Sequence, residues 1–140
     1  MKETEFATRF AAWFLKNRNL FPDKILFEYK VTDGNTFNLK EWTKKQPHQL
    51  RSLTHAQNDV GVYHKISDQS SGQKPADAFF IANGDSYLCV YFNKQKKFFV
   101  LPYPFLVTKI SQTSVSFDQL SQDLDAYTLL QKTKAKIIEF

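Results

Sequence analysis

The sequence predicts one α/β domain in which helices flank a mixed or antiparallel β-sheet. Two features predict this class. Apolar residues recur at helical spacing near both ends of the chain, and several β-rich runs lie between them. A chain of 140 residues is long enough to bury one hydrophobic core, so we expect a single domain over residues 1–140.

Three helices are expected. Residues 3–17 carry Phe6, Phe10, Trp13 and Phe14 at helical spacing, which predicts an amphipathic first helix. The stretch LKEW, from residue 39, suits a helical turn, and Pro47 suits the first turn of a second helix over residues 47–58. A third helix is expected in SFDQLSQDLDAYTLLQK, residues 116–132, where Phe117, Leu120, Leu124 and Tyr127 have helical spacing and Ser116 suits the N-cap.

Five runs have strand character. The first is ILFEYKVT, residues 25–32. The other four are GVYHKIS, ADAFFIA, YLCVYF and KFFVLPY, which follow one another with short breaks from Gly61 onward. Asn83, Gly84 and Asp85 have the composition of a hairpin turn, so we expect ADAFFIA and YLCVYF to pair through it.

Composition restricts the function classes. The net charge of +5 favours a polyanionic partner, although many basic proteins bind no nucleic acid. The single cysteine, Cys89, excludes an internal disulfide and a multi-cysteine zinc site. No run of about 18 apolar residues is present, and the first ten residues do not have the pattern of a signal peptide. We therefore expect a cytoplasmic protein that does not insert into membranes.

An acid and a base interrupt the first strand. Because side chains alternate across a strand, Glu28 and Lys30 point to the same face, roughly 7 Å apart at their Cα atoms. One interpretation is an ordinary surface ion pair, worth about 0–1 kcal/mol. The other is a functional pair, because a rigid strand face holds an acid and a base in a fixed geometry.

The wider pattern favours the second interpretation. A helix with a glutamate precedes the stretch FEYKVTDGNTFNLKEW, which begins with the strand, and a helix that opens with PHQLRSL follows it. With FATRFAAWFLK, YHKISD, KPADAFFI and YLCVYF, these stretches resemble the PD-(D/E)XK nuclease superfamily, in particular the Holliday junction resolvases of RecU type and their phage relatives. The resemblance covers most of residues 3–107.

That resemblance implies a restriction-endonuclease-like fold with a central mixed sheet and a Mg²⁺-dependent DNA endonuclease, in which Mn²⁺ can replace Mg²⁺. Four-way junctions would be the DNA substrate. A homodimer would supply two symmetric cuts, since a twofold axis relates two identical sites. The protein would act in the cytoplasm, or in the host cytoplasm if it is phage-encoded.

Site residues follow from the resemblance by position. Glu28 corresponds to the metal ligand, assisted by the carbonyl of Tyr29, and Lys30 corresponds to the catalytic lysine. Glu5 corresponds to the glutamate of the first helix, and Gln49 to the glutamine that faces the site from the second helix.

The aspartate that completes the metal site in the family has no obvious equivalent here. Asp23 lies five residues before Glu28, which leaves too little chain for the usual preceding strand. We rank Asp77 first, because it opens a β-run that could lie beside ILFEYKVT; Asp23 is second and Asp68 third.

Four basic residues, Lys44, Lys45, His48 and Arg51, cluster where the second helix begins. They suit contacts with DNA phosphates, although such clusters are often only solvated surface. Two other functions stay open. One is a non-catalytic DNA- or protein-binding descendant of the fold, and the other is a restriction- or repair-type nuclease that cuts linear or single-stranded DNA.

Overall fold

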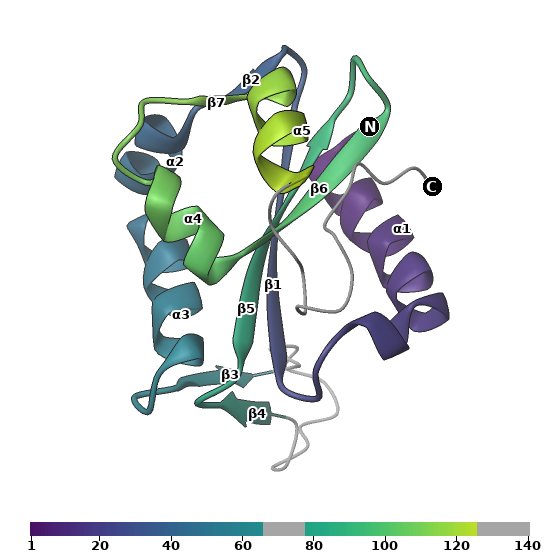
Figure 1. The fold of residues 1–140 in the computed structure, drawn as a ribbon. Coiled ribbons are helices and arrows are strands. Elements are labelled where there is room, and N and C mark those ends of the chain that lie inside the picture. Colours follow the sequence, from purple (N-terminus) through teal and green to yellow (C-terminus); the bar gives the residue numbers. More distant parts are fainter. Residues whose placement is uncertain (66–77, 126–140) are drawn as a thin grey trace, which may run out of the picture.

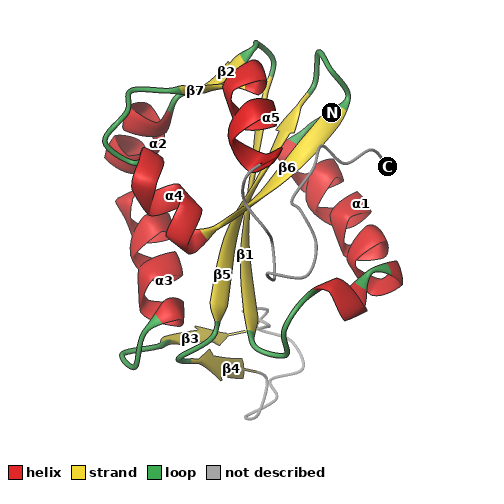
Figure 2. Ribbon diagram, in the orientation of Figure 1, coloured by secondary structure: helices red, strands yellow, loops and turns green. Residues whose placement is uncertain are grey.

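The computed structural model describes residues 1–65 and 78–125. This part of the chain contains both helices and strands, and the central sheet is mixed, with helices on both faces (Figures 1 and 2). The predicted α/β class is confirmed at this level. The helices are α1 (Glu3–Lys16), the short 3-10 helix η1 (Arg18–Leu20), α2 (Leu39–Lys45), α3 (Pro47–Gln57), α4 (Tyr103–Lys109) and α5 (Phe117–Asp125).

The central sheet has three strands in the order β1-β5-β6. Strand β1 (Ile25–Thr32) runs parallel to β5 (Asp85–Phe92), and β5 runs antiparallel to β6 (Lys97–Pro102). Strand β5 is buried on both faces, which explains its nearly continuous apolar sequence. Strand β1 has only one neighbour in this sheet and keeps an alternating pattern, so it can carry charged residues on one face.

Two apolar layers cover the sheet. One is rich in aromatic residues: α1 contributes Phe6 and Phe10, which pack against the face of β1 that carries Phe27 and Tyr29. The other layer lies beneath α2, α3, α4 and α5 and contains Leu26 of β1. Figure 1 shows α1 on one side of the sheet and α2, α3 and α4 on the other. The predicted division of β1 into two faces is confirmed.

Several local predictions are also confirmed. Strand β1 has the expected bounds, Pro47 stands in the first turn of α3, and α1 buries Phe6 and Phe10. Helix α5 begins after Ser116, whose hydroxyl oxygen accepts a hydrogen bond from the backbone N–H of Gln119 at 3.0 Å. This is the predicted N-cap, which satisfies one of the free N–H groups of the first turn.

The predicted hairpin at Asn83–Asp85 is wrong, and the β-rich runs do not form one sheet. Strand β4 (Ala78–Ile81) pairs with β3 (Val62–Lys65) in a separate two-stranded sheet, and β5 pairs with β1 and β6 instead. The N–H groups of the would-be turn bond elsewhere: Gly84 donates to Ala56 of α3, and Asp85 donates to Lys24 just before β1. These bonds direct the chain from β4 into the position beside β1.

Two features were not predicted. Helix α4 follows β6 directly, where the apolar sequence had suggested only a strand; Pro104, in its first turn, was the available signal. Strands β2 (Thr36–Phe37) and β7 (Val115–Ser116) form a two-residue antiparallel pair that ties the loop after β1 to the start of α5. None of the helices described here is long and apolar enough to cross a membrane.

Candidate functional site

The site lies on the face of β1 that is turned toward α2 and α3. Leu26, Glu28, Lys30 and Thr32 share this face, as their alternation along the strand requires. Lys30 is buried, with only 8% of its surface exposed, and Glu28 is half-buried. A buried lysine requires polar partners, because an unpaired buried charge is costly.

Two side chains hold the ammonium group of Lys30. Its Nζ donates to Oε1 of Gln46 at 2.7 Å and lies 3.5 Å from Oε1 of Glu3. Gln46 stands between α2 and α3, and Glu3 is the first residue of α1, so three separate elements meet at this one nitrogen. Glu28 is not one of these partners, although it shares the strand face with Lys30.

Burial raises the pKa of Glu28 above its ordinary value of 4.5. The nearby positive charges of Lys30 and His48, and a backbone hydrogen bond involving Tyr29, act in the opposite direction, while the negative charge of Glu3 adds to the increase. The net increase means that burial and the acidic neighbour outweigh the stabilising contacts. Among the residues described, Glu28 forms no ion pair. Its carboxylate would therefore gain from a cation.

Glu28 opens into a pocket of about 390 Å³ between β1 and α3. The pocket is lined by Leu26, Phe27, Glu28, His48, Gln49, Ser52 and Val62. His48 and Gln49 come from the first turn of α3 and Val62 from the start of β3. The structure thus brings Gln49 to the same pocket as Glu28.

The side chain of Gln49 has a fixed orientation. The indole N–H of Trp42 donates to Oε1 of Gln49 at 2.7 Å. Because an indole nitrogen only donates, the atom that faces it must be the amide oxygen. The NH₂ group of Gln49 is then the part that remains for other partners.

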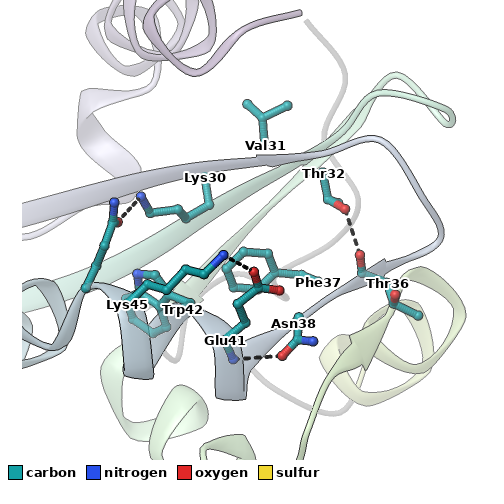
Figure 3. Close-up of a pocket in the computed structure, with 10 residues that line it drawn as sticks. Lys30, Val31, Thr32, Thr36, Phe37, Asn38, Glu41, Trp42 and Lys45 are labelled. Carbon is teal, nitrogen blue, oxygen red and sulfur yellow. Dashed lines mark hydrogen bonds and ion pairs between the residues drawn. The ribbon is translucent and has the colours of Figure 1, made fainter.

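A second hollow, of about 320 Å³, lies between β1 and α2 (Figure 3). Lys30 and Thr32 line it from the strand, and Asn38, Glu41, Trp42, Lys45 and Gln46 are among the residues that line it from the other side. Lys45 donates to the carboxylate of Glu41, four residues earlier on α2, and this hydrogen bond holds the pKa of Glu41 below its ordinary value. Lys30 therefore lines this hollow, while Glu28, two residues earlier on the same strand face, lines the first pocket.

The first helix presents a different glutamate from the one that the resemblance suggested. Glu5 is exposed on α1, whereas Glu3 reaches Lys30. Glu3 precedes Phe6 and Phe10 by three and seven residues, so it lies on the same side of the helix as these buried residues. That spacing was the signal in the sequence that could have identified Glu3. Gln46 had no comparable signal.

Of the three candidate aspartates, only Asp23 belongs to the part of the chain that the structure describes, and it does not line the Glu28 pocket. Asp23 is exposed, lies 3.8 Å from Arg18, and lines a pocket with Ile25, Phe27 and Tyr29, on the opposite face of β1. Asp77 and Asp68 lie outside the described residues. Within residues 1–65 and 78–125, no three His, Cys, Asp or Glu side chains come together as a metal-binding group. Strand β4, which follows Asp77, pairs with β3 rather than with β1.

The predicted basic cluster is at the surface. Lys44, Lys45, His48 and Arg51 are all exposed around the junction of α2 and α3. His48 also lines the Glu28 pocket, and Lys45 lines the second hollow. The cluster therefore borders both concave regions, which is the place where a polyanion would need it.

No family model, curated protein or solved structure matches this chain.

Proposed function

We propose that the protein is a Mg²⁺-dependent endodeoxyribonuclease of the restriction-endonuclease-like, PD-(D/E)XK type. Its most specific form would be a homodimeric resolvase of four-way DNA junctions. The observation that carries the proposal is the grouping of Glu28, Lys30 and Gln49 at one concave face, bordered by exposed basic side chains. An acid and a base fixed on one strand, beside a helix that offers amide donors, suit the binding and hydrolysis of a phosphodiester.

The carboxylates fit a magnesium ion. Mg²⁺ is usually held by one or two carboxylates together with water and substrate phosphates. Glu28 has a half-buried carboxylate without an ion pair among the described residues, and Glu3 is close enough for its charge to raise the pKa of Glu28. These two side chains would hold the ion, and the ligand role of the Tyr29 carbonyl stays a prediction. When bound, Mg²⁺ would act as a Lewis acid toward the phosphate.

The other residues would act on the phosphate directly. Lys30 is held by Gln46, so its positive charge stays beside the strand face where negative charge develops during hydrolysis. The NH₂ group of Gln49 would donate to a phosphate oxygen, because Trp42 already occupies the amide oxygen. His48, at the rim of the same pocket, would add a further contact to the DNA.

The test compares a labelled four-way junction with a linear duplex of the same sequence, each with Mg²⁺ and with EDTA. We expect Mg²⁺-dependent cutting and a preference for the junction. Glu28→Gln should abolish cutting without loss of the fold, and Lys30→Ala should bind DNA but cut far more slowly. Undiminished cutting by either variant would contradict the site assignment. Cutting that ignores branching would favour a restriction- or repair-type nuclease.

The helix glutamates give a second comparison. The resemblance indicates Glu5, whereas the contact with Lys30 indicates Glu3. Glu3→Gln and Glu5→Gln each remove one charge from the same turn of α1, so each serves as the control for the other. We expect a loss of cutting with Glu3→Gln and near-normal cutting with Glu5→Gln. The reverse result would restore the assignment of Glu5.

The exposed basic residues also fit a non-catalytic alternative. Between residues 1 and 65 and between 78 and 125, no group of three potential metal ligands is present. A DNA-binding descendant of the fold would keep the basic rim without hydrolysis. Salt-sensitive DNA binding, with no product after long incubation in Mg²⁺ or Mn²⁺, would establish that alternative in place of the nuclease.

A further inference from the structure

The side-chain amides of two glutamines at the start of α3 have the same orientation, because the oxygen of each faces a donor. Gln49 accepts a hydrogen bond from Trp42, and Gln46 accepts one from Lys30. An indole N–H and an ammonium group are donors only, so each must face the amide oxygen of its glutamine. Both NH₂ groups are consequently directed away from these partners.

Neither NH₂ group has a hydrogen-bond partner among the described residues. In that part of the chain, the only fully buried side-chain polar atom that lacks a partner is Oε1 of Gln95. The amide nitrogens of Gln46 and Gln49 are therefore not sealed in the interior. They remain accessible to a ligand, and a ligand that binds an NH₂ group must present an acceptor atom.

The two donors serve different concave regions. Gln49 lines the Glu28 pocket, and Gln46 lines the hollow between β1 and α2 that Figure 3 shows. The hollow also receives the charged ends of Lys30 and Lys45. No acidic residue lies in the first turn of α3, so the positive end of its dipole is not offset there.

The acidic groups near the hollow do not prevent an anion from binding. Lys45 and Glu41 form an exposed pair, with 70% and 53% of their side chains exposed. Exposed pairs of this kind contribute little stability, so a phosphate could displace Glu41 from Lys45 at small cost. Glu3 is half-exposed and lies at 3.5 Å from Lys30, while Gln46 holds the same ammonium at 2.7 Å.

We propose that the hollow between β1 and α2 is a second phosphate-binding site, in which Gln46 is the donor to the phosphate next to the one bound at Gln49. This proposal rests on the proposed function, because it assumes a DNA strand at the Glu28 pocket. The two concave regions are neighbours along β1, because Glu28 lines one, Lys30 lines the other, and residues two apart on a strand lie roughly 7 Å apart. That spacing suits consecutive phosphates of one strand, which would run along β1 from Glu28 toward Thr32.

A conservative substitution tests whether Gln46 binds a phosphate or only positions Lys30. Gln46→Glu keeps an oxygen that can accept from Lys30, but it replaces the NH₂ group with a negative oxygen. If Gln46 only positions Lys30, the variant should bind DNA like the wild type. If Gln46 binds phosphate, the affinity should fall by about tenfold or more, the typical effect of losing a hydrogen bond to a charged group. Gln49→Glu is the parallel variant for the first site.

The experiment measures junction binding in EDTA with a series of DNAs, each carrying one neutral methylphosphonate in place of a phosphate. We expect the loss of DNA affinity caused by Gln46→Glu to disappear when the methylphosphonate stands at one particular position. The loss caused by Gln49→Glu should disappear at the adjacent position. The second site would be overturned if Gln46→Glu bound DNA with wild-type affinity. It would also be overturned if the loss of affinity disappeared at no methylphosphonate position, or at the same position as the loss caused by Gln49→Glu.

Gln112→Glu is the matched control. Gln112 lies after α4, and its Oε1 likewise accepts a hydrogen bond, from Gln119 at 3.0 Å, so the substitution makes the same charge change and keeps the acceptor. It should leave DNA affinity unchanged. The two proposals can be refuted separately. If the wild type binds and cuts DNA and Gln46→Glu binds DNA normally, only the second site is refuted. A wild type that does not bind DNA refutes both.

Discussion

Replacement of Glu28 by glutamine should stabilise the protein at neutral pH. Burial raises the pKa of this carboxyl in the folded state above its ordinary value of 4.5. The folded state therefore holds the proton more tightly than the unfolded state. The resulting contribution to stability is complete below the unfolded pKa and is lost as the pH rises through the folded pKa. At pH 7 the ionised carboxylate thus lowers the free energy of unfolding, and Glu28→Gln removes that cost.

The magnitude is modest. Each unit of pKa difference corresponds to about 1.4 kcal/mol, and the partial exposure of Glu28 reduces the effect. We expect a gain of about 1 kcal/mol or less at pH 7, which corresponds to a rise in Tm of at most about 4 °C for a domain of this size. The gain should diminish as the pH falls through the folded pKa toward the ordinary value of 4.5, because the wild-type carboxyl then becomes protonated.

Magnesium should reverse the order of stability. If Glu28 binds Mg²⁺, the ion stabilises the wild type by about 1.4 kcal/mol at ten times its Kd and leaves Glu28→Gln unchanged. Thermal unfolding followed by circular dichroism, at pH 5 and pH 7 and with and without Mg²⁺, measures both effects. Asp59→Asn, at an exposed position after α3, is the control for the loss of one negative charge. A less stable Glu28→Gln in EDTA, or an equal Mg²⁺ shift in both proteins, would refute the reasoning.

Three further predictions concern the neighbouring groups. Glu41→Gln should release Lys45 from its ion pair and increase DNA affinity a few-fold, measured by fluorescence anisotropy; an unchanged affinity would argue against Lys45 as a DNA contact. Trp42→Phe should slow cutting by about tenfold or less, because Gln49 loses the donor that orients it, whereas Trp13→Phe, in the other apolar layer, should not affect cutting. DNA affinity should fall as salt increases, with a slope set by the number of phosphates contacted.

Much of the fold follows from local patterns in the sequence. The alternation of ILFEYKVT and the spacing of Phe6 and Phe10 specify both the elements and their buried faces, because each pattern is satisfied by packing against a single layer. Strand pairing was less predictable. Asn83 and Gly84 have the composition of a hairpin turn, but their backbone N–H groups bond to the end of α3, and no local pattern reports a partner so distant in sequence.

The candidate site could also be predicted only in part from the sequence. Glu28 and Lys30 could be placed on one face from their spacing alone, and the resemblance placed Gln49 beside them. The partners of Lys30 could not be predicted in the same way. Glu3 and Gln46 come from two different elements, and they meet at one ammonium group only because α1 and the junction of α2 and α3 approach β1 from separate directions.

The structure shows how the amides of Gln46 and Gln49 are oriented, and this orientation determines which of their atoms can bind a ligand. The residue types alone do not give this information. A glutamine can donate or accept, so Gln46 and Gln49 in a sequence are compatible with a metal, a water molecule, a base or a phosphate. Once Lys30 and Trp42 each donate to one of these oxygens, the orientation of both amides is set, and the NH₂ groups are the parts that can bind an acceptor. With the ammonium group of Lys30 beside Gln46, the donors favour anionic oxygen acceptors. A strand with regularly spaced phosphates matches that arrangement better than an isolated anion, because it can occupy both positions at once.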